Sequence, residues 1–191
     1  MNKVLKWVLI SVGSLVLIAF LGFLWFIPPF TLLEPEAFSD PAQNAPPSLD
    51  HIEDPAQRLL AERGKYLVNS GYCIGCHVPL GDEGPNYDLY LAGGMEFSTR
   101  SGTYYSANLT PDPETGLGRY TDEEIKRALQ NGVRSDGRLM DPGAMPWTLT
   151  SSWTEEDLHA AIVYLRNIKP VYHKIPDPLL VNTLDTMVPG D

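Results

Sequence analysis

Residues that could hold a metal-containing cofactor stand together at Cys73, Cys76 and His77. The spacing Cys-x-x-Cys-His is that of covalent c-type haem attachment, in which two thioethers fix the porphyrin and the adjacent imidazole binds the iron. The chain has two cysteines, and the motif uses both. The sequence therefore predicts one covalent haem c, with Cys73 and Cys76 as its thioether residues and His77 as an axial iron ligand.

Two other kinds of site use a pair of cysteines at this spacing. A thioredoxin-like redox pair is expected after a strand in a βαβ unit, whereas residues 61–72 have the apolar pattern of a helix. A zinc site would need a fourth ligand, and the sequence has no second Cys/His cluster to supply it. Haem attachment is the interpretation that the motif favours.

Helical patterns recur on both sides of the motif. Residues 55–72 have an apolar and a charged face, and Gly64 in their middle is expected at a close helix crossing. Capping signals at Thr121 and Thr154 predict two further helices. A loop as long as residues 78–120 suits a chain that wraps around a large apolar cofactor. The residues therefore predict a mainly α domain with three principal helices.

The N-terminal residues 1–27 are strongly apolar after two early lysines. Such a stretch can cross a hydrocarbon core of about 30 Å, and the lysines predict a cytoplasmic N-terminus. The apolar run continues to Pro28 without a small-residue cleavage site, so an uncleaved signal anchor is favoured over a cleaved signal peptide. We expect a single-pass protein of the bacterial cytoplasmic membrane whose remaining domain is periplasmic.

Proline-rich residues 28–54 predict an extended linker, residues 55–171 the haem domain, and residues 172–191 an extended tail. The chain has 24 acidic and 14 basic residues, for a formal charge of −10. This balance argues against nucleic acid or anionic lipid as a partner, and it suits docking to a basic surface.

Short segments around the motif resemble class I monohaem cytochrome c. They more closely resemble the cytochrome c domains of membrane dehydrogenases such as quinoprotein alcohol dehydrogenase. The segments are RGKYL at 63–67, LAGG at 91–94, YSANLTPDPETGLG at 105–118, AMPW at 144–147 and AAIVYLR at 160–166. The resemblance implies a class I cytochrome c fold, with three principal helices around one covalent haem and an added transmembrane helix. Such subunits often carry several haems, so the resemblance is to one domain.

The resemblance also implies further residues of the haem site. Met145, which precedes a proline, is the implied sixth iron ligand, and Met140 is the alternative. Pro85, in a Gly-Pro-Asn turn, is implied to accept the ring N–H of His77. The other residues implied to surround the haem are Tyr105, Asn108 and Trp147, with Tyr104 and Arg100 as weaker candidates for propionate partners. His159 and His173 are expected at the surface.

Together these features predict a membrane-anchored carrier of single electrons that performs no bond-making chemistry of its own. Histidine/methionine ligation raises the reduction potential and leaves no open position on the iron. The expected partners are redox proteins, as other subunits of a respiratory, photosynthetic or dehydrogenase complex. Two alternatives stay open: a haem sensor or enzyme with a displaceable sixth ligand, and a mainly structural subunit whose linker and tail lie on its partners.

Overall fold

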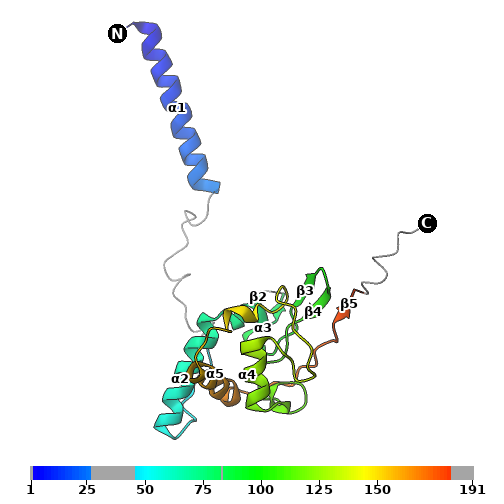
Figure 1. The fold of residues 1–191 in the computed structure, drawn as a ribbon. Coiled ribbons are helices and arrows are strands. Elements are labelled where there is room, and N and C mark those ends of the chain that lie inside the picture. Colours follow the sequence, from blue (N-terminus) through cyan, green and yellow to red (C-terminus); the bar gives the residue numbers. More distant parts are fainter. Residues whose placement is uncertain (1, 27–45, 83, 182–191) are drawn as a thin grey trace, which may run out of the picture. The chain divides into compact units, whose positions relative to one another are not determined.

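A computed structural model of the chain describes residues 2–26, 46–82 and 84–181. The chain divides into two units, Met1–Ala45 and Pro46–Asp191, which are described separately. The part of the predicted linker before residue 46 and the part of the predicted tail after residue 181 lie outside the described residues. About half of the described chain is helical, and its elements are drawn in Figure 1. This helical content is compatible with a cytochrome c.

The first unit contains the helix α1, Lys3–Phe26. Its side chains are almost all apolar and exposed, which is the pattern of a helix that faces lipid rather than a protein core. Among the described residues it is the one helix long and apolar enough to cross a membrane. The predicted apolar N-terminal helix is therefore present, and its insertion in a membrane stays a prediction.

The second unit is organised around two crossing helices, α2 (Pro55–Ser70) and α5 (Glu155–Asn167). Asp54 caps α2 by accepting a hydrogen bond from a backbone N–H of its first turn. At the crossing, a Cβ added to Gly64 would lie 1.9 Å from the carbonyl oxygen of Ala160. The close helix crossing expected at Gly64 is confirmed, since no larger residue fits there.

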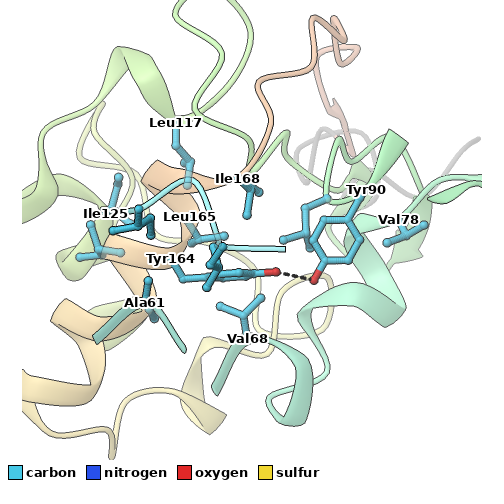
Figure 2. Close-up of a cluster of buried hydrophobic side chains, with 14 residues drawn as sticks. Ala61, Val68, Val78, Tyr90, Leu117, Ile125, Tyr164, Leu165 and Ile168 are labelled. Atoms are coloured by element: carbon cyan, nitrogen blue, oxygen red, sulfur yellow. Dashed lines mark hydrogen bonds between the residues drawn. The ribbon is translucent and has the colours of Figure 1, made fainter. Parts of the chain in front are cut away.

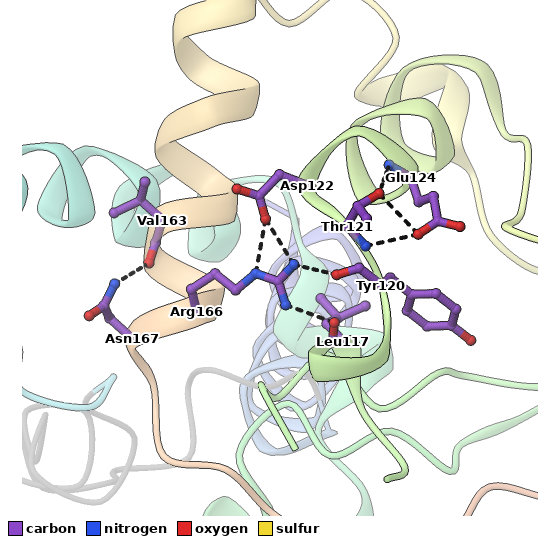
Figure 3. A network of polar contacts seen from close by, with 8 residues as sticks. All are labelled: Leu117, Tyr120, Thr121, Asp122, Glu124, Val163, Arg166 and Asn167. Carbon is purple, nitrogen blue, oxygen red and sulfur yellow. Dashed lines mark hydrogen bonds and ion pairs between the residues drawn. The ribbon is translucent and has the colours of Figure 1, made fainter. Parts of the chain in front are cut away.

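The other helices are short. The helix α3 is the motif itself, Cys73–His77, and α4 spans Asp122–Asn131. The capping box predicted at Thr121 is complete, because Thr121 and Glu124 bond each other's backbone N–H (Figure 3). Gly132 ends α4 in the left-handed region, with φ 68°. The helices predicted before the motif, from Thr121 and from Thr154 are thus α2, α4 and α5.

The core lies between these helices and the chain that follows the motif (Figure 2). Tyr164 of α5 is fully buried, and its hydroxyl is hydrogen-bonded to that of Tyr90 at 3.0 Å. Tyr90 in turn donates to Asn69 of α2 at 3.3 Å. Burial raises the pKa of both tyrosines, so the pair stays neutral. This chain of bonds joins α2, α5 and the loop after α3.

The folded unit begins before α2. Leu49 and Ile52 are 1% and 4% exposed and belong to the hydrophobic core. Arg58 of α2 also donates from Nε to the carbonyl of Ile52 at 2.8 Å. The linker predicted over residues 28–54 therefore extends too far toward the C-terminus. The prolines near Leu49 and Ile52 indicated an extended segment, although both residues are buried in the core.

Short strands, which were not predicted from the sequence, lie in the long loop and in the tail. The strands β3 (Glu96–Thr99) and β4 (Gly102–Tyr105) form a hairpin, and β5 (Leu179–Leu180) pairs with β4. A smaller hairpin joins β1 (Leu80–Gly81) to β2 (Gly84–Pro85). Single-turn 3₁₀ helices span Tyr87–Leu89, Leu117–Arg119 and Trp147–Leu149.

Candidate cofactor site

The motif residues lie on one short helix. Positions i, i+3 and i+4 of a helix share a face, so Cys73, Cys76 and His77 of α3 are directed to one side. The helix starts after Tyr72, whose left-handed conformation, φ 63°, turns the chain sharply out of α2. Both cysteines are free and partly buried, and His77 is buried. The local fold thus presents two thiols and one imidazole together.

A single hydrogen bond fixes the His77 ring. Its Nδ1 atom lies 2.7 Å from the carbonyl oxygen of Ala107. A carbonyl can only accept, so Nδ1 carries the proton and Nε2 has a free lone pair. Burial lowers the pKa of His77, which keeps the ring neutral. Metal-bound histidines have this form, with the second nitrogen held by a carbonyl or carboxylate.

The Ala107 carbonyl replaces the partner that was predicted for His77. Pro85 was implied to accept this ring N–H, but it is exposed in the small hairpin, where it pairs with Leu80. Ala107 reaches His77 because Gly93, which donates its N–H to the His77 carbonyl at 2.8 Å, lies directly beside it. The carbonyl that holds the His77 ring in this structure is thus that of Ala107, and a contact between Pro85 and a haem stays a prediction.

The contact between Ala107 and His77 requires a glycine at position 93. Its φ is +73°, and an added Cβ would lie 2.3 Å from the carbonyl oxygen of Ala107. Two further bonds tie the segments on either side, from Leu109 N to Leu91 O and from Ser106 N to Met95 O, each 2.9 Å long. The LAGG segment therefore lets the backbone come close enough to place the carbonyl that orients His77.

Asn108 is committed to protein contacts. It is 3% exposed, and its amide donates to the Val171 carbonyl at 2.8 Å and to Thr115 at 3.1 Å. Its Oδ1 accepts from the backbone and the hydroxyl of Thr110. Both amide hydrogens are used, so neither is left for a haem propionate. Asn108 instead joins the segment after Ala107 to the segment after α5.

Tyr105 and its neighbours lie on the β3–β4 hairpin. Tyr105 is half-buried and pairs with Glu96 across the hairpin. The hydroxyl of Tyr104 is 2.9 Å from that of Ser101, and Arg100 is exposed in the turn. A contact between Tyr105 and a haem stays a prediction.

Met145 lies in a tight loop between α4 and α5. The half-buried Met145 donates its N–H to Asp141 O at 2.9 Å and accepts from Trp147 N at 2.8 Å. Trp147 covers Gly132 at the end of α4, where an added Cβ would lie 2.3 Å from the indole. The indole N–H of Trp147 is 3.3 Å from the Met140 carbonyl. The loop has a defined course, while iron ligation by Met145 stays a prediction.

Of the two histidines expected at the surface, His159 is exposed and His173 is not. The half-buried His173 ring lies against Gly94, and its Nδ1 is 3.0 Å from the Ala92 carbonyl. Its backbone N–H also donates to Thr115 at 3.0 Å. The expectation for His173 was wrong, because the residues after α5 pack back onto the LAGG segment.

The structure also bears on the two other kinds of site, a redox pair and a zinc site. Burial raises the pKa of the Cys73 thiol to about 11, whereas a redox pair works through a thiolate of lowered pKa. Within the described ranges, no group of three or more His, Cys, Asp or Glu side chains is placed to hold a metal ion by itself. Two thiols and an Nε2 ligand on one helix face fit haem c, whose porphyrin supplies four further iron ligands.

Several known proteins have sequences similar to this chain. A stretch of 117 residues is 41% identical to the cytochrome c subunit of alcohol dehydrogenase (quinone) from Gluconacetobacter polyoxogenes, covering 61% of this chain and 24% of that protein. The corresponding Gluconobacter oxydans subunit is 39% identical over 130 residues, 66% of this chain and 26% of the relative. The chain is similar to cytochrome c subunits of dehydrogenases.

A third relative extends the similarity to another dehydrogenase. The gluconate 2-dehydrogenase cytochrome c subunit of Pantoea cypripedii is 35% identical over 120 residues, covering 62% of this chain and 26% of the relative. The chain spans about a quarter of the length of these cytochrome c subunits. No protein-family model matches the chain. The resemblance to cytochrome c domains of membrane dehydrogenases, drawn from short segments, is confirmed.

Proposed function

We propose that this protein is a membrane-anchored monohaem c-type cytochrome. It transfers single electrons on the extracytoplasmic side of the membrane, as a subunit of a dehydrogenase or other respiratory or photosynthetic complex. The observation that carries the proposal is His77, whose Nδ1 is held by Ala107 at 2.7 Å so that Nε2 is free beside two cysteines. The similarity to cytochrome c subunits at 35–41% identity supports the same assignment.

The proposal assigns one role to each residue of the site. Cys73 and Cys76 would form the two thioethers, and His77 and Met145 would be the axial ligands. When bound, haem c supplies the one-electron couple of its iron. The Ala107 carbonyl orients the His77 ring and increases the basicity of Nε2, which favours the oxidised iron. Burial of His77 excludes water from its side of the site.

The chain would be an electron carrier and not an enzyme by itself. With histidine and methionine as axial ligands, no position on the iron is open to a substrate. The sequence holds one Cys-x-x-Cys-His motif, which supports one haem for this chain. A displaceable sixth ligand, as in a sensor or a haem enzyme, is the competing outcome that a spectrum decides.

Three features support the location and the kind of partner. The exposed apolar helix α1 begins at Lys3, and positive residues at the start of such a helix favour a cytoplasmic N-terminus with export of the rest. The relatives are named as subunits of dehydrogenases, so we infer that redox subunits of a membrane complex are the partners. The charge of −10 suits a basic docking surface.

The proposal is tested on the full chain matured in a bacterial host that attaches haem c. We expect the intact mass to exceed that of the polypeptide by one haem, and the excess to be lost when both cysteines are replaced by alanine. The oxidised protein should be low-spin, with the weak red-end absorption band of methionine-ligated haem. An unchanged polypeptide mass, or a high-spin spectrum that shifts with carbon monoxide, would contradict the proposal.

A further inference from the structure

The side chain of Asp141 joins two segments that are far apart in the sequence. Its Oδ2 accepts hydrogen bonds from Thr99, at 3.0 Å, at the end of β3 and from Ser101 in the turn that follows. Its Oδ1 accepts the backbone N–H of Gly143 at 2.7 Å. A carboxylate with three donors from two segments fixes their relative position, because bonds to an ionised group are short and strong.

The backbone of the same residue holds the predicted sixth ligand. The carbonyl oxygen of Asp141 accepts the N–H of Ala144 at 3.0 Å and the N–H of Met145 at 2.9 Å. The Asp141 carboxylate is thus bonded to the hairpin, while its carbonyl fixes the backbone position from which the Met145 side chain extends.

Several hydrogen bonds fix the hairpin turn. The backbone N–H of Ser101 donates to the Thr99 hydroxyl at 3.2 Å, its hydroxyl oxygen accepts from Tyr104 at 2.9 Å, and its carbonyl accepts from Val181 N at 3.0 Å. The strand β4 that leaves this turn leads within two residues to Ala107, the partner of His77. The hairpin thus supports His77 at one end and the Met145 loop at the other.

From these contacts we infer that Asp141 is a positioning residue for Met145: its carboxylate, bonded to Thr99 and Ser101, holds the loop in the conformation in which the thioether reaches the iron. This inference rests on the proposed function, in which Met145 is the sixth ligand. Asp141 itself touches neither the thioether nor any other proposed ligand atom through its side chain, so its effect is on how strongly the methionine competes for the iron.

The test uses the full-length holoprotein and free imidazole, which competes with the methionine for the sixth position. The red-end band reports methionine ligation during the titration. In Asp141→Ala we expect the imidazole concentration that removes half of the band to fall roughly tenfold, the effect of losing one hydrogen-bonded charged group. Asp141→Asn should lie in between, because its amide can still donate to the hydroxyl oxygens.

Two variants serve as controls. Asp136→Asn changes a carboxylate in the same loop that is bonded to Arg138 rather than to the hairpin, and it should titrate like the parent protein. Ser101→Ala removes one donor from the partner side, and it should lower the half-point in the same direction even if Asp141→Ala fails to fold. The inference would be overturned if Ser101→Ala lost half of the band at the same imidazole concentration as the parent protein. It would also be overturned if Asp136→Asn shifted this concentration as much as Asp141→Ala.

The proposed function is checked separately with Met145→Ala. Loss of the red-end band in this variant, together with unchanged titrations of the Asp141 and Ser101 variants, would overturn the positioning role and leave the ligand assignment standing. A band that persists in Met145→Ala would overturn the ligand assignment, and with it the role of Asp141.

Discussion

Replacement of Gly93 by alanine should disturb the hydrogen bond that orients His77. A Cβ at this position would lie 2.3 Å from the Ala107 oxygen and 2.5 Å from the Ser106 oxygen. Both contacts are to backbone, so no side chain can rotate away to make room. The segment that carries Ala107 must move, and the 2.7 Å bond to Nδ1 of His77 moves with it.

Two effects of Gly93→Ala can be given magnitudes. A left-handed conformation costs a residue with a side chain about 1–2 kcal/mol, and the forced backbone shift adds about 1–3 kcal/mol of overpacking. A weakened bond to Nδ1 makes Nε2 less basic, which destabilises oxidised iron more than reduced iron. A difference of about 0.5–1 kcal/mol between the two states raises a one-electron potential by roughly 20–40 mV.

The matched control is Gly137→Ala. Gly137 also has a positive φ, +84°, but an added Cβ there meets no atom within 4 Å. It should therefore show the conformational cost in denaturant unfolding without the change in potential. Spectroelectrochemical titration measures the potential of the three holoproteins. If Gly93→Ala and Gly137→Ala have the same potential as the parent, the Ala107 carbonyl does not help to set the potential, contrary to this prediction.

The helices that support the site depend on one close crossing and one half-buried arginine. Gly64→Ala should lower the free energy of unfolding by about 3 kcal/mol or more, because its Cβ would overlap the Ala160 carbonyl. Leu59→Ala, on an exposed face of α2, is the control. Equal losses of unfolding free energy in the two variants would contradict the tight crossing. Arg166→Ala should cost about 2–3 kcal/mol in urea unfolding, since its guanidinium donates to the Leu117 carbonyl at 2.8 Å and to Asp122 (Figure 3). Arg166→Lys should lose nearly as much unfolding free energy as Arg166→Ala. Parent-like stability in Arg166→Lys would show that the charge alone, and not the guanidinium geometry, stabilises this contact.

Local signals in the sequence were sufficient for the helices and for the motif. The capping box at Thr121 and the closely approached Gly64 carry their structural meaning in residue type and spacing, and both were predicted. The Cys-x-x-Cys-His spacing likewise places its three side chains on one helix face whatever surrounds it. Such features depend on residues within a few positions of each other, or on one small residue.

Contacts made by backbone atoms could not be predicted in the same way. Every residue has a carbonyl, so nothing in the sequence distinguishes Ala107 as the partner of His77. The short strands and the packing of His173 depend on residues brought together over long chain distances. The paired glycines at 93 and 94 were the one sequence feature that pointed to this close approach of two backbone segments. Both have positive φ in the structure, a conformation that glycine adopts readily.

A redox titration of the purified full-length holoprotein, followed by its visible spectrum, distinguishes a monohaem electron carrier from the alternatives. We predict a single one-electron transition, a low-spin spectrum in both oxidation states, and a red-end band that disappears on reduction. Several transitions, or a high-spin form that binds carbon monoxide without loss of a native ligand, would contradict the assignment of this protein as a monohaem electron carrier.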